Sequence, residues 1–166
     1  MSDEVLITGR EGFVGTKLNE ELKKHGYSTS GTSLNEFAGG EKENIFQCDI
    51  TDPEKTRKLI FDRRPAAIVH LAALVKPSEA IKDPEKALKI NLDGTRNIFE
   101  AVKAIPGYRP KIVIVGSSEE FGVVPSGIPV TEETFLAPVN PYGESKMLAW
   151  KLAQEYIKKY NLDIIS

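Results

Sequence analysis

Tyr142 and Lys146 stand four residues apart near the C-terminal end of the sequence, a spacing that suits proton transfer. Side chains four residues apart on a helix share one face and lie one turn from each other. An ammonium group beside a phenol stabilises the phenolate, so the tyrosine could exchange a proton with an alcohol or carbonyl oxygen. The alternative is an ordinary solvated helix face, where Tyr and Lys at this spacing are common.

Ser117, Ser118 and Glu119 form a second group, directly after an apolar run at residues 111–115. A hydroxyl at the carboxyl end of a strand could bond to the oxygen that gains or loses the proton, or it could only satisfy backbone amides of a turn. Glu119 is either a general acid or base or an ordinary loop carboxylate. These alternatives stay open on the sequence pattern alone.

Gly9, Gly12 and Gly15 follow the apolar run at residues 5–7 and open an amphipathic stretch at residues 16–24. Their spacing is G-x-x-G-x-x-G, which differs from the G-x-G-x-x-G of the older dehydrogenase fingerprint. Unpaired amides and the dipole at a helix N-terminus favour an anion, and glycines let phosphates approach the backbone. We interpret the segment as a pyrophosphate-binding turn; the alternative is a tight strand-to-helix turn without a ligand.

The elements that must position these residues alternate between strands and helices. The sequence predicts strands at residues 5–8, 27–32, 44–48, 67–71, 111–115 and 162–165, helices at 16–24, 52–64, 83–104 and 141–160, and loops at 36–43 and 122–139. The second loop is long enough to suggest a function. Apolar strands that alternate with helices indicate a parallel sheet covered on both faces. We therefore predict an α/β fold: one doubly wound, Rossmann-like, three-layer α/β/α domain over residues 1–166.

Composition narrows the classes of function. The net charge of −2 gives no sign of a nucleic-acid partner, and no apolar run is long enough to span a membrane. Cys48 is the only cysteine, which excludes an intrachain disulfide, and we expect a small buried side chain there. His70 lies in an apolar strand and is expected to be packed, and His25 lies at a helix end, so we expect no metal site. A cytoplasmic location follows by default.

Six motifs occur in a fixed order along the chain. They are Thr8-Gly9-x-x-Gly12-Phe13-x-Gly15, Asp49-Ile50-x-Asp52, His70-Leu71-Ala72-Ala73, Asn91-x-x-Gly94-Thr95, Gly116-Ser117-Ser118-Glu119-Glu120-Phe121-Gly122 and Pro141-Tyr142-x-x-x-Lys146. Together they resemble the extended short-chain dehydrogenase/reductases that modify nucleotide sugars, the NAD-dependent epimerase/dehydratase family. The resemblance covers essentially the whole chain.

The resemblance implies a set of residues that contact the cofactor. The expected contacts are Gly9, Gly12, Gly15, Phe13 and Val14 at the pyrophosphate, Asp49 and Ile50 at the adenine, Leu71, Ala72 and Ala73 along the cofactor, and Lys146 at the nicotinamide ribose. It also implies that Tyr142 is the acid/base, that Ser117 occupies the catalytic Ser/Thr position, and that Asn91 braces the active site. A homodimer built on the tyrosine helix and the long helix before it is implied in the same way.

Two departures from the family pattern bear on the cofactor. NAD-preferring enzymes usually carry an acidic residue at the end of the second strand, and that position is Ser33 here. Without a carboxylate there, nothing would repel a 2′-phosphate, and Arg10 in the glycine turn could pair with one. The cofactor is therefore expected to be NADP or NAD, with NADP favoured.

The run from Gly116 to Gly122 bears on the reaction, because it looks closest to reductases of 4-keto-6-deoxy sugars carried on GDP. A glutamate two residues after the Ser/Thr position, as Glu119 is here, is also found in dehydratases of the family. We rank a 4-keto reductase first, a 4,6-dehydratase second and a 4-epimerase third, with a non-catalytic dinucleotide-binding module or a fragment as the alternatives of another class.

The length of the chain is its largest departure from the family pattern. Family members are much longer, and their further residues complete the sheet and build the small domain that grips the nucleotide sugar. We expect that C-terminal substrate domain to be absent here, so that the 166 residues bind the dinucleotide weakly and turn over poorly.

Overall fold

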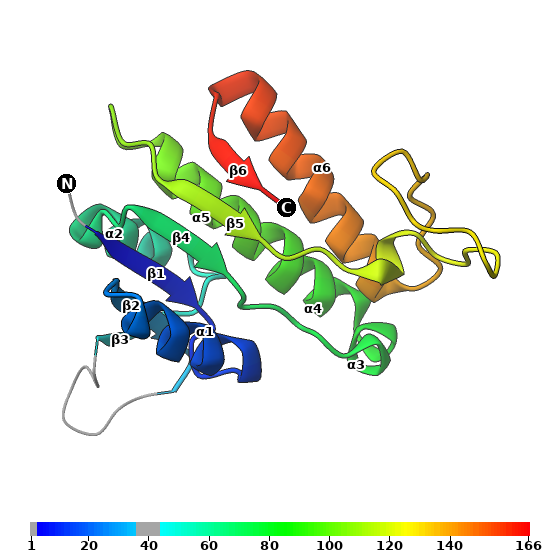
Figure 1. The fold of residues 1–166 in the computed structure, drawn as a ribbon, viewed down its shortest axis with the longest axis horizontal. Helices are drawn as coiled ribbons and strands as arrows, with labels where there is room; N and C mark the ends of the chain where they lie inside the picture. The colour runs from blue at the N-terminus through cyan, green and yellow to red at the C-terminus, as the bar shows by residue number, and fades with distance from the viewer. Residues whose placement is uncertain (1–2, 36–43) are drawn as a thin grey trace.

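The computed structural model describes residues 3–35 and 44–166, which contain a six-stranded parallel sheet (Figure 1). The strands are β1 Glu4–Thr8, β2 Ser28–Ser33, β3 Ile45–Gln47, β4 Ala67–His70, β5 Lys111–Ile114 and β6 Asp163–Ile165. They lie in the order β3-β2-β1-β4-β5-β6. This order is the doubly wound arrangement, in which the chain starts at the middle of the sheet and winds outward in both directions. The predicted fold is confirmed, and the loop expected at residues 36–43 lies outside the described residues.

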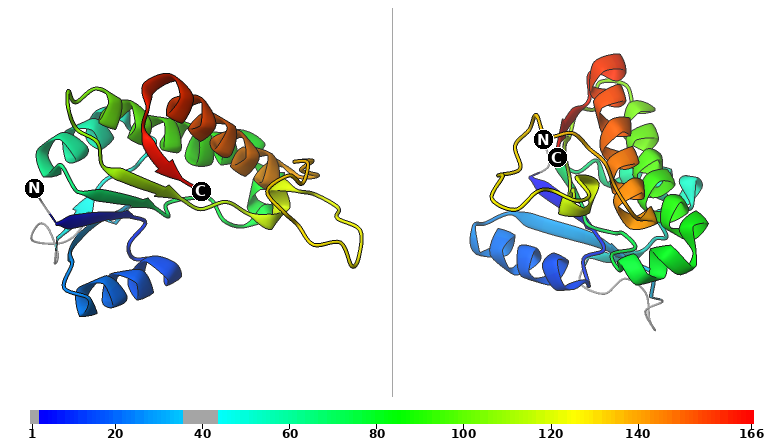
Figure 2. Two further views of the ribbon diagram at one scale, coloured as in Figure 1. Left: turned by 45° about the horizontal axis from the view of Figure 1, so that its top comes forward. Right: turned by 90° about the vertical axis from the view of Figure 1, so that its right-hand side faces the viewer.

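Helices cover the sheet from two sides. They are α1 Phe13–Lys24, α2 Pro53–Arg63, α3 Pro77–Lys82, α4 Pro84–Leu88, α5 Gly94–Lys103 and α6 Pro141–Tyr160, with a π-helical turn, η1, at Lys89–Asp93 and a 3₁₀ turn, η2, at Ser118–Glu120. Figure 2 shows α1 on one face of the sheet and α2, α5 and α6 on the other. Right-handed crossovers explain this division, because the chain moves across the sheet in opposite directions before and after β3.

Local sequence signals set the residues at which α2 and α6 begin. The Asp52 carboxylate accepts hydrogen bonds from the backbone amides of Glu54 and Lys55, and the Asn140 side chain accepts one from Gly143. Proline follows each of these caps, at the first helical position, where its missing N–H costs nothing. The predictions of helices at residues 52–64 and 141–160 are therefore confirmed within a residue.

The prediction of one helix over residues 83–104 is wrong in detail. The structure divides this stretch into α4, η1 and α5, and it adds the short helix α3, which the sequence pattern did not predict. Six residues are too few to show a helical period, which explains why α3 was missed. A π-helical turn arises where tertiary contacts outweigh regular hydrogen bonding, and such turns are frequent at functional sites.

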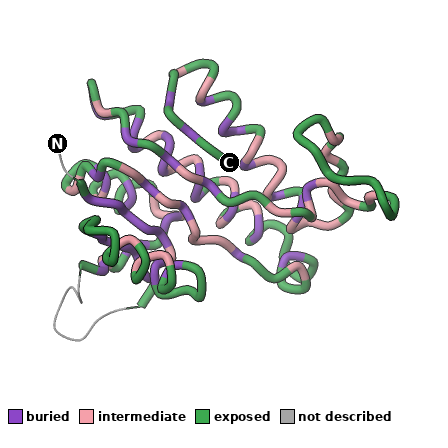
Figure 3. Tube along the Cα trace, viewed as in Figure 1, coloured by how far each residue is buried: buried purple, intermediate pink, exposed green. Residues whose placement is uncertain are grey.

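The main hydrophobic core lies between the sheet and the layer formed by α2, α5 and α6. Buried side chains from β1, β4 and β5 meet the fully buried Phe99 of α5 and Tyr156 of α6, whose rings lie 5.2 Å apart. Figure 3 shows buried segments concentrated in these strands and along the inner sides of the helices. This layer holds the helices that carry the candidate catalytic residues in fixed positions.

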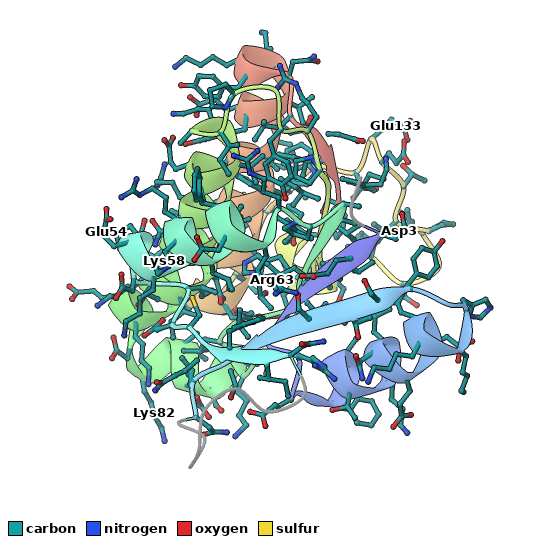
Figure 4. All side chains as sticks on the ribbon, turned by 90° about the vertical axis from the view of Figure 1, so that its left-hand side faces the viewer. Asp3, Glu54, Lys58, Arg63, Lys82 and Glu133 are labelled. Atoms are coloured by element: carbon teal, nitrogen blue, oxygen red, sulfur yellow. The ribbon has the colours of Figure 1, made fainter. Side chains whose placement is uncertain are left out.

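One polar contact ties the start of β1 to the end of α2. The Nε atom of Arg63 donates to Glu4 Oε1 at 3.1 Å, its Nη2 atom donates to Oε2, and Ser30 Oγ donates to Oε1 at 2.6 Å. Figure 4 shows Arg63 beside β1, while Glu54 lies on the outer side of α2. This contact lies at the amino ends of the strands, away from the edge where ligands bind in such sheets.

None of the helices in the described residues combines the length and the apolar character that a membrane-spanning segment requires.

Candidate functional site

The glycine turn after β1 packs so closely on its surroundings that side chains are excluded. Gly9 has a φ of +66°, and a Cβ atom added there would lie 3.0 Å from the Ala72 backbone nitrogen. A Cβ on Gly15 would lie 2.6 Å from the Gly9 carbonyl oxygen. The turn therefore needs glycine at both positions, and it brings the start of α1 against the end of β4.

The N-terminus of α1 is open to a ligand. Its N-cap residue is Gly12, which has no side chain to accept the first helical amides, and no acidic residue stands in the first turn. Phe13 and Val14, the first two helical residues, are 86% and 58% exposed. The first amides of a helix have no intrahelical acceptor, and the helix dipole favours an anion beside them. This helix start fits a pyrophosphate.

A cleft of about 780 Å³ runs along the carboxyl ends of the strands in front of this turn. The predicted cofactor residues that line it are Gly9, Gly12, Phe13, Val14, Gly15, Ser33, Asp49, Ile50, Leu71, Ala72 and Ala73. The volume is in the range of small-molecule and cofactor sites. Sequence reasoning missed Lys86 and Lys89, which also line the cleft and bring positive charge to it.

At one end of the cleft, the segment after β3 presents Asp49 and Ile50. One carboxylate oxygen of Asp49 accepts the Thr51 amide at 2.9 Å, so the side chain is oriented by its own turn. Ile50 is buried, and its carbonyl accepts a hydrogen bond from Asn97 Nδ2 at 2.9 Å. Cys48, just before them, is buried as expected.

Ser33 ends β2 without a carboxylate of its own, as the sequence indicated, but a carboxylate from another element reaches it. Glu11, from the glycine turn, reaches Ser33: its Oε2 atom accepts a hydrogen bond from Ser33 Oγ and another from Asn35 Nδ2, the latter at 3.1 Å. The expected partner of a 2′-phosphate, Arg10, is only 4% exposed, and its aliphatic part packs against Gly31. A sequence pattern could not reveal this, because Glu11 and Ser33 lie on different elements that only the fold brings together.

A smaller cavity of about 160 Å³ adjoins the cleft and contains the candidate catalytic pair. Tyr142 and Lys146, both from the first turns of α6, line it. Its wall also includes residues that line the larger cleft, namely Val14, Leu71, Ala72, Ala73 and Val75. The two spaces therefore adjoin along this wall, which places Tyr142 and Lys146 next to the cleft.

Glu120 is the carboxylate that the structure places in this cavity, and sequence reasoning did not select it. It is buried, and its Oε1 atom accepts the Ser117 amide at 2.8 Å. Burial raises the pKa of Glu120, while the Ser117 amide and the charge of Lys146 act against that increase. Burial lowers the pKa of Lys146, and Glu120 opposes that decrease. The two groups therefore stabilise each other's charge inside the cavity.

Ser117 is the N-cap of η2 and Glu119 lies within this turn, and Ser117 is not among the residues that line the cavity. Ser117 Oγ accepts the Glu119 amide at 3.2 Å, which leaves its hydroxyl proton able to bond elsewhere. The Glu119 carboxylate accepts a hydrogen bond from Asn140 Nδ2 at 2.6 Å, at the N-cap of α6. Glu119 is not among the residues that line the cavity, so its role as a general acid or base stays a prediction to which the geometry adds nothing.

His70 is packed rather than free, as expected. Its Nδ1 and Nε2 atoms lie 2.7 Å from Thr8 Oγ1 and 3.1 Å from Thr95 Oγ1. Thr95 donates its proton to the Asn91 carbonyl, and Thr8 accepts two amides, so Nε2 must carry the ring proton and Nδ1 must accept. Burial, with a smaller effect of the Lys146 charge, lowers the pKa of His70 to about 3. This neutral histidine therefore orders the turn rather than exchanging protons.

Asn91 connects three parts of the site. Its Oδ1 atom accepts the Leu74 amide at 2.8 Å, and its Nδ2 atom donates to the Leu74 carbonyl at 3.1 Å and to Ser145 Oγ at 2.9 Å. Ser145 in turn donates to the Tyr142 carbonyl at 2.7 Å. Asn91 thus holds the segment after β4 against the turn of α6 that carries the tyrosine.

Within residues 3–35 and 44–166, no group of three or more His, Cys, Asp or Glu side chains is arranged to hold a metal ion.

Comparison with known proteins agrees with this geometry. A model of the NAD dependent epimerase/dehydratase family matches residues 5–166. The chain belongs to this family. UDP-glucose 4-epimerase of Lactobacillus helveticus is 30% identical, over 90% of this chain and 46% of the relative. GDP-6-deoxy-D-mannose reductase of Pseudomonas aeruginosa is 30% identical, over 94% of this chain and 48% of the relative. The chain thus spans about half the length of the curated relatives it matches.

Solved structures give the same result for the fold. UDP-glucose 4-epimerase of Thermus thermophilus, in complex with NAD, superimposes with a TM-score of 0.85 and 28% identity, over 97% of this chain and 53% of that chain. The RMD protein of Pseudomonas aeruginosa, complexed with NADPH, superimposes with a TM-score of 0.79 and 28% identity, over 97% of this chain and 50% of that chain. The neighbours therefore include proteins that hold each of the two nicotinamide dinucleotides.

Proposed function

We propose that this chain binds a nicotinamide dinucleotide and takes part in hydride transfer at C4 of a nucleotide sugar. The observation that carries the proposal is the shared wall of the two spaces: the cleft in front of α1 adjoins the cavity that is lined by Tyr142 and Lys146. The open helix start accommodates the pyrophosphate, and the cleft extends from there toward Asp49 for the adenosine. When bound, the nicotinamide supplies or accepts the hydride.

The residues of the cavity provide the proton that must accompany a hydride. On reduction of a keto sugar, Tyr142 donates its hydroxyl proton to the carbonyl oxygen, and on oxidation it takes that proton back. The half-buried ammonium group of Lys146 brings positive charge to the cavity that Tyr142 also lines, and Glu120 favours the charged form of Lys146. Ser117, at the end of β5, donates its hydroxyl to the same sugar oxygen.

Among the possible reactions, reduction of a 4-keto-6-deoxy sugar stays our first proposal, because of the run from Gly116 to Gly122. A 4-epimerase is the second candidate, since the UDP-glucose 4-epimerase of Lactobacillus helveticus is 30% identical. A 4,6-dehydratase receives less support, because a general base must reach the substrate and Glu119 instead bonds to Asn140. A GDP-sugar is the proposed substrate, and a homodimer through α5 and α6 the proposed assembly.

Replacement of Tyr142 by Phe tests the proposal. We expect single-turnover hydride transfer, followed with GDP-, UDP- and dTDP-sugars at high protein concentration, to fall by about 100-fold or more, because the proton donor is lost. Binding of the reduced dinucleotide should change little, since the phenol hydroxyl is not needed to hold the pyrophosphate.

Tyr160→Phe, on the same helix but outside the residues that line the cavity, is the matched control and should retain full transfer. Hydride transfer that survives Tyr142→Phe would contradict the assigned role. Dinucleotide binding without transfer to any of these sugars, in the unmodified chain, would favour a non-catalytic binding module instead.

A further inference from the structure

Glu11 occupies a place where its carboxylate can control which dinucleotide enters the cleft. It belongs to the glycine turn, between Gly9 and Gly12, yet its side chain ends at the carboxyl end of β2. There its Oε2 atom accepts hydrogen bonds from Ser33 Oγ and from Asn35 Nδ2. Two donors on one carboxylate oxygen fix the orientation of the group. A carboxylate has about four lone-pair sites, so it can still accept a further hydrogen bond from a ligand.

The end of β2 is where a doubly wound sheet places the adenosine ribose of a bound dinucleotide. Ser33 and its neighbours Thr32 and Leu34 line the cleft here, on the same side as Asp49 and Ile50. Glu11 is not itself one of the residues that line the cleft, but its carboxylate accepts a hydrogen bond from Ser33, which is. The negative charge that β2 itself lacks is therefore supplied from the glycine turn.

We propose that Glu11 makes this site selective for NAD(H) over NADP(H). This inference rests on the proposed dinucleotide-binding function. The Glu11 carboxylate accepts a hydrogen bond from a ribose hydroxyl of NAD(H), and it repels the 2′-phosphate of NADP(H), which carries close to two negative charges. The choice would thus be made by a residue of the pyrophosphate turn rather than by a residue of the second strand.

Arg10 is the positively charged residue of the glycine turn, and near the ribose it would attract the 2′-phosphate that Glu11 repels. Its side chain is buried, its aliphatic part covers Gly31, and it lines a hollow beside α1 together with residues such as Asn19 and Lys23. Glu11 lines the same hollow, and neither residue is among those that line the cleft; Glu11 differs because its carboxylate contacts Ser33, a residue of the cleft. The structure therefore sets Arg10 into the layer between α1 and the sheet, and the group held on Ser33 is the carboxylate of Glu11.

The test compares the binding of NADH and NADPH to the whole chain, without any sugar. Trp150 lines the cavity next to the cleft, so quenching of its fluorescence reports a bound dinucleotide. We expect NADH to bind at least about tenfold more tightly than NADPH, a ratio that a single like-charge contact can produce. Glu11→Gln, which keeps the shape and an acceptor but removes the charge, should reduce the ratio to near one, mainly through tighter NADPH binding.

Glu20→Gln is the matched control. Glu20 is an exposed carboxylate of α1 whose partner is Lys17 at 3.0 Å, so its replacement changes the net charge equally without touching β2. The ratio should stay at the unmodified value in this variant. Circular dichroism of each variant verifies that it is folded before the titration.

Any other result of these titrations would contradict the inference, and each result would show which part of it is wrong. Equal binding of NADH and NADPH, or tighter binding of NADPH, would show that Glu11 does not select. A preference for NADH that persists in Glu11→Gln, or that Glu20→Gln also removes, would assign the selection elsewhere. If neither dinucleotide binds to the unmodified, folded chain, the proposed dinucleotide-binding function itself is wrong. The outcomes described before this one would contradict only the role of Glu11 and would leave the proposed function standing.

Discussion

At the scale of single residues, two adjacent glutamates of this chain have different environments. Glu119 extends from η2 to the side chain of Asn140, whereas Glu120 is buried beside Lys146 and accepts the Ser117 amide. The motif in which both occur could not tell them apart, because a single 3₁₀ turn rotates successive side chains to different sides. The carboxylate whose charge acts on Lys146 is therefore Glu120, one residue further along the chain than Glu119, which the sequence analysis selected.

Replacement of Glu120 by Gln should change the pH dependence of hydride transfer. Burial lowers the pKa of Lys146 and Glu120 opposes this, so without the carboxylate the pKa of Lys146 falls further. Lys146 is needed in its charged form, which exists below its pKa, and the loss of activity on the alkaline side should therefore begin at a lower pH. The measurement is the rate of single-turnover transfer as a function of pH.

Glu119→Gln is the control, because it removes the neighbouring charge without touching Lys146. Its pH profile should match that of the unmodified chain. A shifted profile in Glu119→Gln, with none in Glu120→Gln, would restore Glu119 as the acidic residue of the site.

At the scale of elements, the short helices between β4 and α5 pack against the end of α6 that carries Tyr142. Tyr142 packs against a small apolar cluster of Leu74, Ala80 and Ala87, which come from the segment after β4, from α3 and from α4. The π-helical turn η1 places Asn91 where it bonds both to Leu74 and to Ser145. These elements hold the phenol from one side while the main core holds the rest of α6 from the other.

Replacement of Asn91 by Ala should destabilise the chain by about 1–3 kcal/mol, because it leaves the buried amide and carbonyl of Leu74 without their partner. Hydride transfer should fall as well, since the first turn of α6 loses its link through Ser145. Urea unfolding followed by circular dichroism measures the free energy of unfolding.

Asn97→Ala is the matched control on the same helical stretch. Asn97 makes one hydrogen bond, to the Ile50 carbonyl at 2.9 Å, so its loss should cost about 1 kcal/mol and should leave the rate of transfer unchanged. An equal effect of the two substitutions on stability and rate would mean that Asn91 has no special part in positioning α6.

At the scale of the whole molecule, the two faces of the sheet are covered unequally. On the face that carries α1, a row of side chains runs in register across the sheet through Ile7, Val69, Val113 and Ile165. Ile7 is fully buried, Val69 and Val113 are half-buried, and Ile165 is 48% exposed. The opposite face is buried against α2, α5 and α6 throughout. An apolar strip is therefore open over β4, β5 and β6.

This strip should make the chain bind apolar dyes and associate with itself. Replacement of Ile165 by Lys should reduce both the fluorescence of a bound naphthalene sulfonate dye and the apparent mass in sedimentation, with little change in melting temperature. Val130→Lys is the control, because Val130 is 47% exposed in the loop before α6 and away from the sheet. Equal effects of the two substitutions would show that the strip has no special role in association.

The sequence by itself determined those features of this protein that depend on residues close together in the chain. The alternation of apolar runs with capped helices was enough to predict the parallel sheet, and proline after Asp52 and Asn140 marked the starts of α2 and α6. The glycine spacing predicted the turn that packs against β4. These features could be read because hydrogen bonds and sterics between near neighbours in the chain set them.

The tertiary structure decided which side chains meet. It brought Glu11 to Ser33, Glu120 rather than Glu119 to Lys146, and Asn91 to Ser145. It also divided the long predicted helix at η1 and added α3, because contacts with α6 outweigh local helix preference there. Each of these pairs lies on two different elements, so only the packing of the sheet and its helices fixes the distance between them. That is why the spacing of Tyr142 and Lys146 could single out a candidate pair, while the Glu120 carboxylate near Lys146 and the Glu11 carboxylate at Ser33 could not be predicted.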